Sequence, residues 1–297
     1  MKRRTFIEKS SLIAVSLSAF GTIQWNGKNY TGDSATTTDI LGPFYRPGAP
    51  FRSNLVPPNS KGVPLNLKGI IYKEDGRTPL NNALVEIWHC DENQHYDNMS
   101  DDYLFRGATE TTKDGRYEFS TIVPVPYKVD PEDENSLWRP AHIHMRVSVA
   151  NQQDLITQIY FKGDKYLEKD MSSSSPQAVS RILSISKDPS GNNTVIFDVV
   201  MNKEFPLENE VYNKISGIYR MENNNMIEFY REDDLLFMKR NGQLVAGLKY
   251  LGNNTFEGGI GYPKVKFELM EKGGPKAVVE FRRLTITGEK FLKYSKG

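Results

Sequence analysis

Short apolar stretches recur along most of this chain, and turn-forming residues separate them. Between Leu65 and Met201 the stretches show partial period-two alternation, and turns such as Lys113-Asp114-Gly115-Arg116 interrupt them. Strands of this kind are typical of antiparallel sheets packed face to face. Only Pro176 to Ile185 has a weak helical pattern. We therefore predict an all-β chain whose main domain, residues 38–204, is an antiparallel β-sandwich.

A second series of strand-like stretches begins near Asn209 and defines a predicted domain over residues 209–297. Asn241-Gly242 lies between two apolar stretches, which is the strongest short signal for a hairpin. This segment contains no His or Cys, so it is a poor candidate for a catalytic metal site. We predict an antiparallel meander that closes into a small barrel, and it resembles the lipocalin-like β domains appended to secreted enzymes.

The N-terminus has the pattern of an export signal. Lys2-Arg3-Arg4-Thr5-Phe6 precedes a short apolar stretch, Ser11 to Phe20, and the paired arginines are typical of a twin-arginine signal. We predict a signal peptide over residues 1–24, a polar linker over 25–37, and export to the periplasm or the cell exterior. The alternatives are an uncleaved disordered tail or a simple anchor.

Charge and cysteine content exclude some classes of partner. The chain has 38 basic and 37 acidic residues, a formal net charge of +1, without a basic stripe. Nucleic acid and anionic membranes are therefore not expected as partners. The single cysteine, Cys90, excludes an internal disulfide, and no disulfide-linked partner is expected. A homo-oligomer is compatible with this composition.

The segment His142-Ile143-His144 is the first candidate for chemistry. In a strand, residues i and i+2 project to the same face, so both imidazoles can face one metal ion. The alternative is a pair of polar residues on a solvated face. Arg139 and Pro140 immediately before the pair favour a shaped site.

Two histidines do not complete a coordination sphere, and the residues alone leave the other ligands open. A carboxylate would give a two-His-one-carboxylate iron site. Zinc would prefer Cys or a third His, from among His89, Cys90 and His95. His89 shares a strand face with Val85 and Ile87, which indicates a buried structural residue.

Several segments of the chain resemble segments of the intradiol ring-cleavage dioxygenases, which include catechol 1,2-dioxygenase and protocatechuate 3,4-dioxygenase. They occur in the same order as in that family. The resemblance covers residues 38–201 and implies a sandwich of the transthyretin (prealbumin) type that binds Fe(III). The implied ligands are Tyr96, Tyr127, His142 and His144. The matching segments are Leu41-Gly42-Pro43-Phe44-Tyr45, Val85-Glu86-Ile87-Trp88-His89, Gln94-His95-Tyr96, Thr112-Lys113-Asp114-Gly115-Arg116-Tyr117, Pro124-Val125-Pro126-Tyr127, Trp138 to His144, and Ile156-Thr157-Gln158-Ile159-Tyr160-Phe161.

The resemblance also implies catalytic roles. Tyr127 is the implied ligand that substrate displaces, and it helps to remove a proton. Arg139 is implied to stabilise negative charge on the substrate ring, where the alternative is a structural ion pair. Gln158 is implied to form a hydrogen bond with Arg139 or with substrate, and the alternative is a surface amide. Tyr45 is implied to contact substrate. Val125 departs from the family pattern, in which Gly is commoner.

The predicted function is cleavage of a small catechol-type aromatic diol with O₂ to a cis,cis-muconate-type diacid. Two alternatives come from other classes. A non-catalytic transthyretin-like binding module would not need two tyrosines together with His-x-His. A zinc hydrolase would use His89 or His95.

Overall fold

The computed structural model describes residues 17–18, 21–22, 35–150, 152–202, 207–232, 235–270 and 273–291. The predicted signal peptide and most of the predicted linker lie outside these residues, apart from the paired strands β1 (Leu17–Ser18) and β2 (Gly21–Thr22). Within the part of the chain that the structure describes, no helix is long and apolar enough to cross a membrane.

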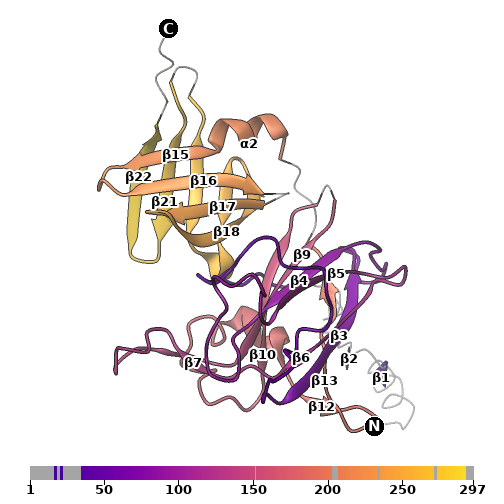
Figure 1. The fold of residues 1–297 in the computed structure, drawn as a ribbon. Helices are drawn as coiled ribbons and strands as arrows, with labels where there is room; N and C mark the ends of the chain where they lie inside the picture. The colour runs from indigo at the N-terminus through magenta and orange to yellow at the C-terminus, as the bar shows by residue number, and fades with distance from the viewer. Residues whose placement is uncertain are drawn as a thin grey trace, which may run out of the picture.

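Two five-stranded sheets form the sandwich in the indigo-to-magenta half of Figure 1. The first sheet has the order β11 (Ile182–Leu183), β10 (Leu155–Phe161), β9 (His142–Ser148), β4 (Leu84–Trp88) and β5 (Arg106–Glu110). The second contains β12 (Ser186–Lys187), β13 (Asn193–Ile196), β3 (Pro64–Tyr72), β14 (Val199–Val200) and β6 (Arg116–Ile122). A separate ribbon pairs β7 (Tyr127–Lys128) with β8 (Trp138–Arg139). Antiparallel ladders dominate, as predicted, but β11, β13 and β14 pair in parallel.

Strand alternation divides the first sheet into two faces with different residues. Ile143, Met145 and Val147 of β9 enter the apolar core between the sheets. The intervening residues of β9 therefore point to the opposite face, which we call the outer face. This face carries polar side chains, yet His142, His144 and Arg146 are all buried. Something other than the second sheet must therefore cover it.

The C-terminal segment forms a closed antiparallel barrel, at the top of the view in Figure 1. Its strands are β15 (Gly217–Met221), β16 (Met226–Glu232), β17 (Leu235–Arg240), β18 (Gln243–Gly252), β19 (Thr255–Glu257), β20 (Lys264–Glu268), β21 (Lys276–Phe281) and β22 (Leu284–Lys290). Tyr219, Phe229, Phe256 and Phe267 contact one another inside the barrel and are almost fully buried. Packed aromatic rings thus fill the interior that a lipocalin would keep open for a ligand.

The barrel packs on the outer face of the sandwich with β17 and β18 (Figure 1). Leu235 and Phe237 of β17 cluster with Trp88 of β4 and Ile156 of β10. A Cβ atom on Gly259, in the short 3₁₀ turn η2 (Gly259–Gly261), would lie 2.0 Å from the carbonyl carbon of Asp39. The backbones therefore meet closely at this contact.

Helical structure differs in two places from the prediction. The weak pattern at Pro176 to Ile185 forms only a 3₁₀ helix, η1 (Pro176–Arg181), after which Ile182 pairs with β10. A short helix, α2 (Asn209–Ile215), precedes the barrel and was not predicted. Its apolar residues Tyr212 and Ile215 pack into the barrel core, so tertiary contacts stabilise a helix that is too short to form alone.

Candidate metal centre

The strand ladder aligns polar residues on the outer face. His144 of β9 lies opposite Trp88 of β4 on one side and Gln158 of β10 on the other. His142 lies opposite Tyr160 of β10. All five side chains are almost completely buried, with exposed fractions of 1% or less. A fixed ladder with buried polar groups is a suitable frame for a rigid site.

The structure brings the four predicted ligands together. His142 Nε2 lies 3.2 Å from His144 Nε2 and 3.3 Å from Tyr96 Oη. The ring of Tyr127 lies 5.5 Å from that of Tyr96 and 5.6 Å from that of His142, centre to centre. Tyr96 comes from the loop after β4 and Tyr127 from β7, so four separate backbone positions converge on one point.

A hydrogen bond fixes the tautomer of His142. Its Nδ1 lies 2.7 Å from the carbonyl oxygen of Pro140, which can only accept. Nδ1 therefore carries the proton, and the lone pair of Nε2 faces His144 and Tyr96. Burial lowers the pKa of His142 and of His144 well below 6.5, with nearby positive charge as a further cause. Both rings are thus neutral, the form that binds a metal.

The two tyrosines respond to burial in the opposite sense. Burial raises the pKa of Tyr96 well above 10, with Tyr127 as a further cause, and burial also raises the pKa of Tyr127. Both hydroxyl groups therefore keep their protons unless a positive charge is placed beside them. A bound cation inverts this preference, because it stabilises the phenolate form.

The donor set fits a ferric ion. Two ligand atoms that are each roughly 2.1 Å from one ion, at a near right angle, lie about 3 Å apart. The separations of 3.2 and 3.3 Å among the three donor atoms match this spacing. Imidazole suits iron, and phenolate is a hard anionic donor that favours Fe(III). In the described residues, no three His, Cys, Asp or Glu side chains gather as a metal site, and the tyrosines are the further donor groups that lie beside the two histidines.

Arg139 and Gln158 form a buried network beside the four residues. Arg139 Nη2 donates to Gln158 Oε1 at 3.0 Å, and Arg139 Nε donates to Asp170 Oδ2 at 2.8 Å. Burial opposes the charge of Arg139, but Tyr160, Tyr127 and Asp170 outweigh burial and raise its pKa. Gln158 Nε2 donates to the carbonyl of Ile40 at 2.6 Å. The guanidinium is therefore held, charged, next to the tyrosines.

Tyr45 lies apart from this group, behind the Trp88 ring. Its ring centre is 5.0 Å from that of Trp88 and 5.8 Å from that of Phe237 in the barrel. Arg146 Nη1 donates to its hydroxyl at 2.5 Å. Tyr45 is thus a buried residue of the contact with the barrel, and its role in substrate binding stays a prediction.

The other histidines have different environments. His89 is buried, its Nδ1 donates to the Cys90 carbonyl, and its Nε2 accepts from the Thr121 hydroxyl, both at 2.7 Å. Burial lowers its pKa to about 4. His95 has a mostly exposed side chain near Asp91. Protein groups thus engage both nitrogens of His89, which disfavours a zinc site built on it.

Trp88 and Asp170 were not singled out from the sequence, although both contact the site. Trp88 stacks on His144 with ring centres 4.9 Å apart and an angle of 5°. The signal for Trp88 was available, since Glu86 and Trp88 share a face of an otherwise apolar strand. Asp170 lies in a loop, and only the fold shows that it reaches Arg139.

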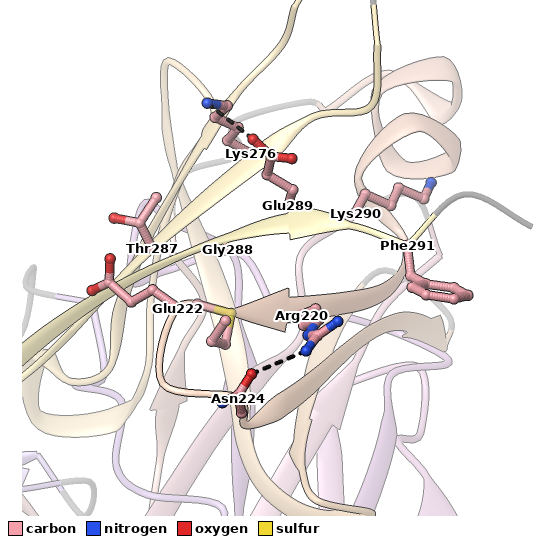
Figure 2. A pocket seen from close by; sticks show the side chains of 10 residues that line it. Arg220, Glu222, Asn224, Lys276, Thr287, Gly288, Glu289, Lys290 and Phe291 are labelled. Carbon is pink, nitrogen blue, oxygen red and sulfur yellow. Dashed lines mark hydrogen bonds and ion pairs between the residues drawn. The ribbon is translucent and has the colours of Figure 1, made fainter.

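A surface hollow of about 660 Å³ lies between β15 and β22 of the barrel (Figure 2). Arg220 donates to Asn224 and Lys276 contacts Glu289, each at 3.1 Å, so contacts within the hollow already engage these side chains (Figure 2). The residues that line it include no His, Cys or Tyr. This hollow therefore lacks the imidazole and phenol groups that gather at the candidate metal centre.

Comparison with known proteins shows the family of this chain. A family model described as "Dioxygenase" matches residues 40–203, more than half of the chain. Chlorocatechol 1,2-dioxygenase of Rhodococcus opacus is 34% identical over 173 residues, which are 52% of this chain and 67% of the relative. 6-Chlorohydroxyquinol 1,2-dioxygenase of Cupriavidus pinatubonensis is 32% identical over 184 residues, 57% of this chain and 64% of the relative.

Solved structures give the same result. Catechol 1,2-dioxygenase of Acinetobacter sp. ADP1 superposes with a TM-score of 0.51 at 28% identity, over 57% of this chain and 63% of that one. The chain thus belongs to the intradiol ring-cleavage dioxygenase family. It spans between half and two thirds of the length of several curated relatives.

Proposed function

We propose that this chain is an Fe(III)-dependent intradiol dioxygenase that cleaves a catechol-type diol with O₂ to a cis,cis-muconate-type diacid. The observation that carries the proposal is the convergence of Tyr96 Oη, His142 Nε2 and His144 Nε2, with the Tyr127 ring beside them. Relatives named for catechol, chlorocatechol and chlorohydroxyquinol support the substrate class. Neither a binding module nor a zinc hydrolase accounts for the two tyrosines.

Tyr96, Tyr127, His142 and His144 would hold the metal. Bound Fe(III) would supply the charge that stabilises the phenolates and makes a chelated catecholate electron-rich toward O₂. Bound to the metal as a phenolate, Tyr127, which lies opposite Arg139 in the β7–β8 ladder, would accept a proton from one substrate hydroxyl. Arg139, held by Asp170 and Gln158, stabilises negative charge that develops on the ring. Burial of the site excludes water, which strengthens this interaction.

A substrate panel tests the proposal. Iron-loaded protein should be red from tyrosinate-to-Fe(III) charge transfer, and it should consume O₂ with catechol, a chlorocatechol or hydroxyquinol. With ¹⁸O₂, mass spectrometry should find two labelled oxygen atoms in the diacid. Tyr96→Phe should shift or abolish the colour. Tyr103→Phe is the control and should leave the colour unchanged, because the Tyr103 hydroxyl forms an exposed hydrogen bond to the Pro47 carbonyl. Iron-replete protein that stays colourless would remove the basis of the assignment.

We also propose that the chain is exported. The support is the twin-arginine pattern at residues 3–4 before a short apolar stretch. Replacing both arginines by lysine should leave the protein in the cytoplasm, as fractionation of expressing cells would reveal. Equal export of both forms would count against a twin-arginine signal.

A further inference from the structure

The two histidines of the candidate metal centre are oriented by different means. His142 is held by its hydrogen bond to the carbonyl of Pro140. In contrast, Nδ1 of His144 is buried without a hydrogen-bond partner among the described residues. Apart from the contact of its Nε2 with His142 Nε2, ring packing therefore orients His144. Trp88 stacks flat on one side of it, and a Cβ on Gly42, whose φ of +77° favours glycine, would lie only 2.9 Å from Cε1 of His144.

A continuous series of ring contacts connects His144 to the barrel. Behind Trp88 lies Tyr45, with ring centres 5.0 Å apart, and behind Tyr45 lies Phe237 of β17 at 5.8 Å and an angle of 11°. Tyr230 of β16 backs Phe237 at 5.4 Å. Rings at these separations make favourable offset or tilted contacts. The position of the Trp88 ring thus depends on a residue of the barrel.

Strand β17 has apolar residues on both faces, which suits this contact. Leu236 and Met238 enter the barrel interior, whereas Leu235 and Phe237 point outward, and all four are at most 2% exposed. A barrel strand normally turns its outward residues to water. Here the sandwich covers them. Because aromatic rings already fill the barrel interior, the outward surface of the barrel is the part that can contact other groups.

Arg146, two residues after His144, also contacts two of these rings. Its guanidinium lies 5.7 Å from the ring centre of Tyr45 and 5.6 Å from that of Phe237. It bonds to the Tyr45 hydroxyl and forms an ion pair with Asp154 at 2.6 Å. The guanidinium of Arg146 therefore links the strand that carries His144 to the rings of Tyr45 and Phe237.

We propose that Phe237 is a positioning residue for His144, acting through Tyr45 and Trp88, so that the barrel is a working part of the metal centre. The metal aspect of this inference rests on the proposed function. The positional aspect does not, because it concerns only where the His144 ring lies. Residues that orient metal ligands typically change metal affinity roughly tenfold to a hundredfold when replaced.

Phe237→Leu and Phe229→Leu form a matched pair for the test. Both phenylalanines are fully buried in the barrel, but Phe229 points into its interior. Histidine resonances of ¹³C-labelled metal-free protein would be compared first. Only four histidines are present, and His144→Gln identifies the signal of interest. Fe(III) affinity would be measured next by competition with nitrilotriacetate. Phe237→Met, which keeps most of the volume, serves if Phe237→Leu does not fold.

The expected result is a moved His144 signal and roughly tenfold weaker Fe(III) binding in Phe237→Leu, with neither change in Phe229→Leu. An unmoved His144 signal, an equal effect of both substitutions, or a moved signal with unchanged Fe(III) affinity would each overturn the proposal. If the unmodified protein bound no Fe(III), the proposed function would fail, while the resonances would still decide whether the barrel positions His144.

Discussion

Glu86 carries a carboxyl group on the outer face, under the barrel. It is 7% exposed and lies opposite Arg146 in the ladder, with Tyr45 Oη 3.5 Å from its Oε2. Burial is the main reason that its pKa rises from 4.5 to about 7. Glu232 of β16 adds to this rise, whereas Arg146 and Arg106 oppose it. A carboxyl group in this position makes stability depend on pH.

We expect Glu86→Gln to become more stable, relative to the unmodified protein, as pH rises. Below pH 4.5 the carboxyl group is protonated in both the folded and the unfolded chain, so it costs nothing. Between pH 4.5 and 7 only the unfolded chain loses the proton. The free energy of unfolding of the unmodified protein therefore falls by roughly 3 kcal/mol over this range, and it stays lower above pH 7. Urea unfolding at pH 4.5 and 8 measures this difference. An equal effect of the substitution at both values would contradict it.

The residues of the site differ in how far the sequence could place them. His142 and His144 follow from strand parity, because i and i+2 share a face in any strand. Tyr96 and Tyr127 come from separate loops, and only the family pattern predicted that they meet the histidines. The burial of Tyr45 depends on the barrel, and no pattern in the sequence around Tyr45 indicates this contact.

At the scale of elements, strands were easier to predict than helices. β9 and β10 match the predicted stretches closely, since apolar residues alternate with polar ones or run without interruption. The strand β17 contained a further signal: Leu235-Leu236-Phe237-Met238 is apolar on both faces, which is typical of a strand that is buried on both sides. The parallel pairing of β11, β13 and β14 could not be predicted, because it depends on strands that are distant in the sequence, and neither could the buried ion pair between Arg181 and Asp39 at the end of η1.

The contact of η2 with the sandwich yields an element-scale prediction. Gly259→Ala should destabilise the protein by about 3 kcal/mol, because its Cβ would meet the backbone of Asp39 and Ile40. Gly247→Ala is the matched control, since its Cβ would meet mainly the end of the Ile156 side chain, which can move, and should cost about 1 kcal/mol. Denaturant unfolding measures both, and equal costs would contradict the backbone contact.

At the scale of the whole molecule, sandwich and barrel share one buried cluster. Leu41, Trp88 and Ile156 come from the sandwich, and Leu235 and Phe237 come from the barrel. None of these side chains is more than 5% exposed. Separation of the two parts would expose this apolar surface to water, which is unfavourable. The two parts should therefore unfold together.

Phe229→Leu, in the barrel core, tests this coupling. The three tryptophans, at positions 25, 88 and 138, all precede the barrel, but Trp88 contacts it, so the test uses a Trp88→Phe background in which the remaining fluorescence reports on the rest of the chain. We expect the substitution to cost about 1–2 kcal/mol and to lower the urea midpoint of tryptophan fluorescence as much as that of far-UV circular dichroism. A fluorescence midpoint that did not change would show that the barrel unfolds independently.

The close approach of Gly259 to Asp39 also bears on how such a chain is inherited. A barrel recruited from another protein would place a side chain there unless it happened to carry glycine, and that side chain would collide with the sandwich backbone. A sandwich that lost its barrel would in turn leave Trp88 and Ile156 uncovered. Each part restricts the substitutions that the other accepts. We therefore expect the two to be passed on as a single unit and to be poorly exchangeable by recombination.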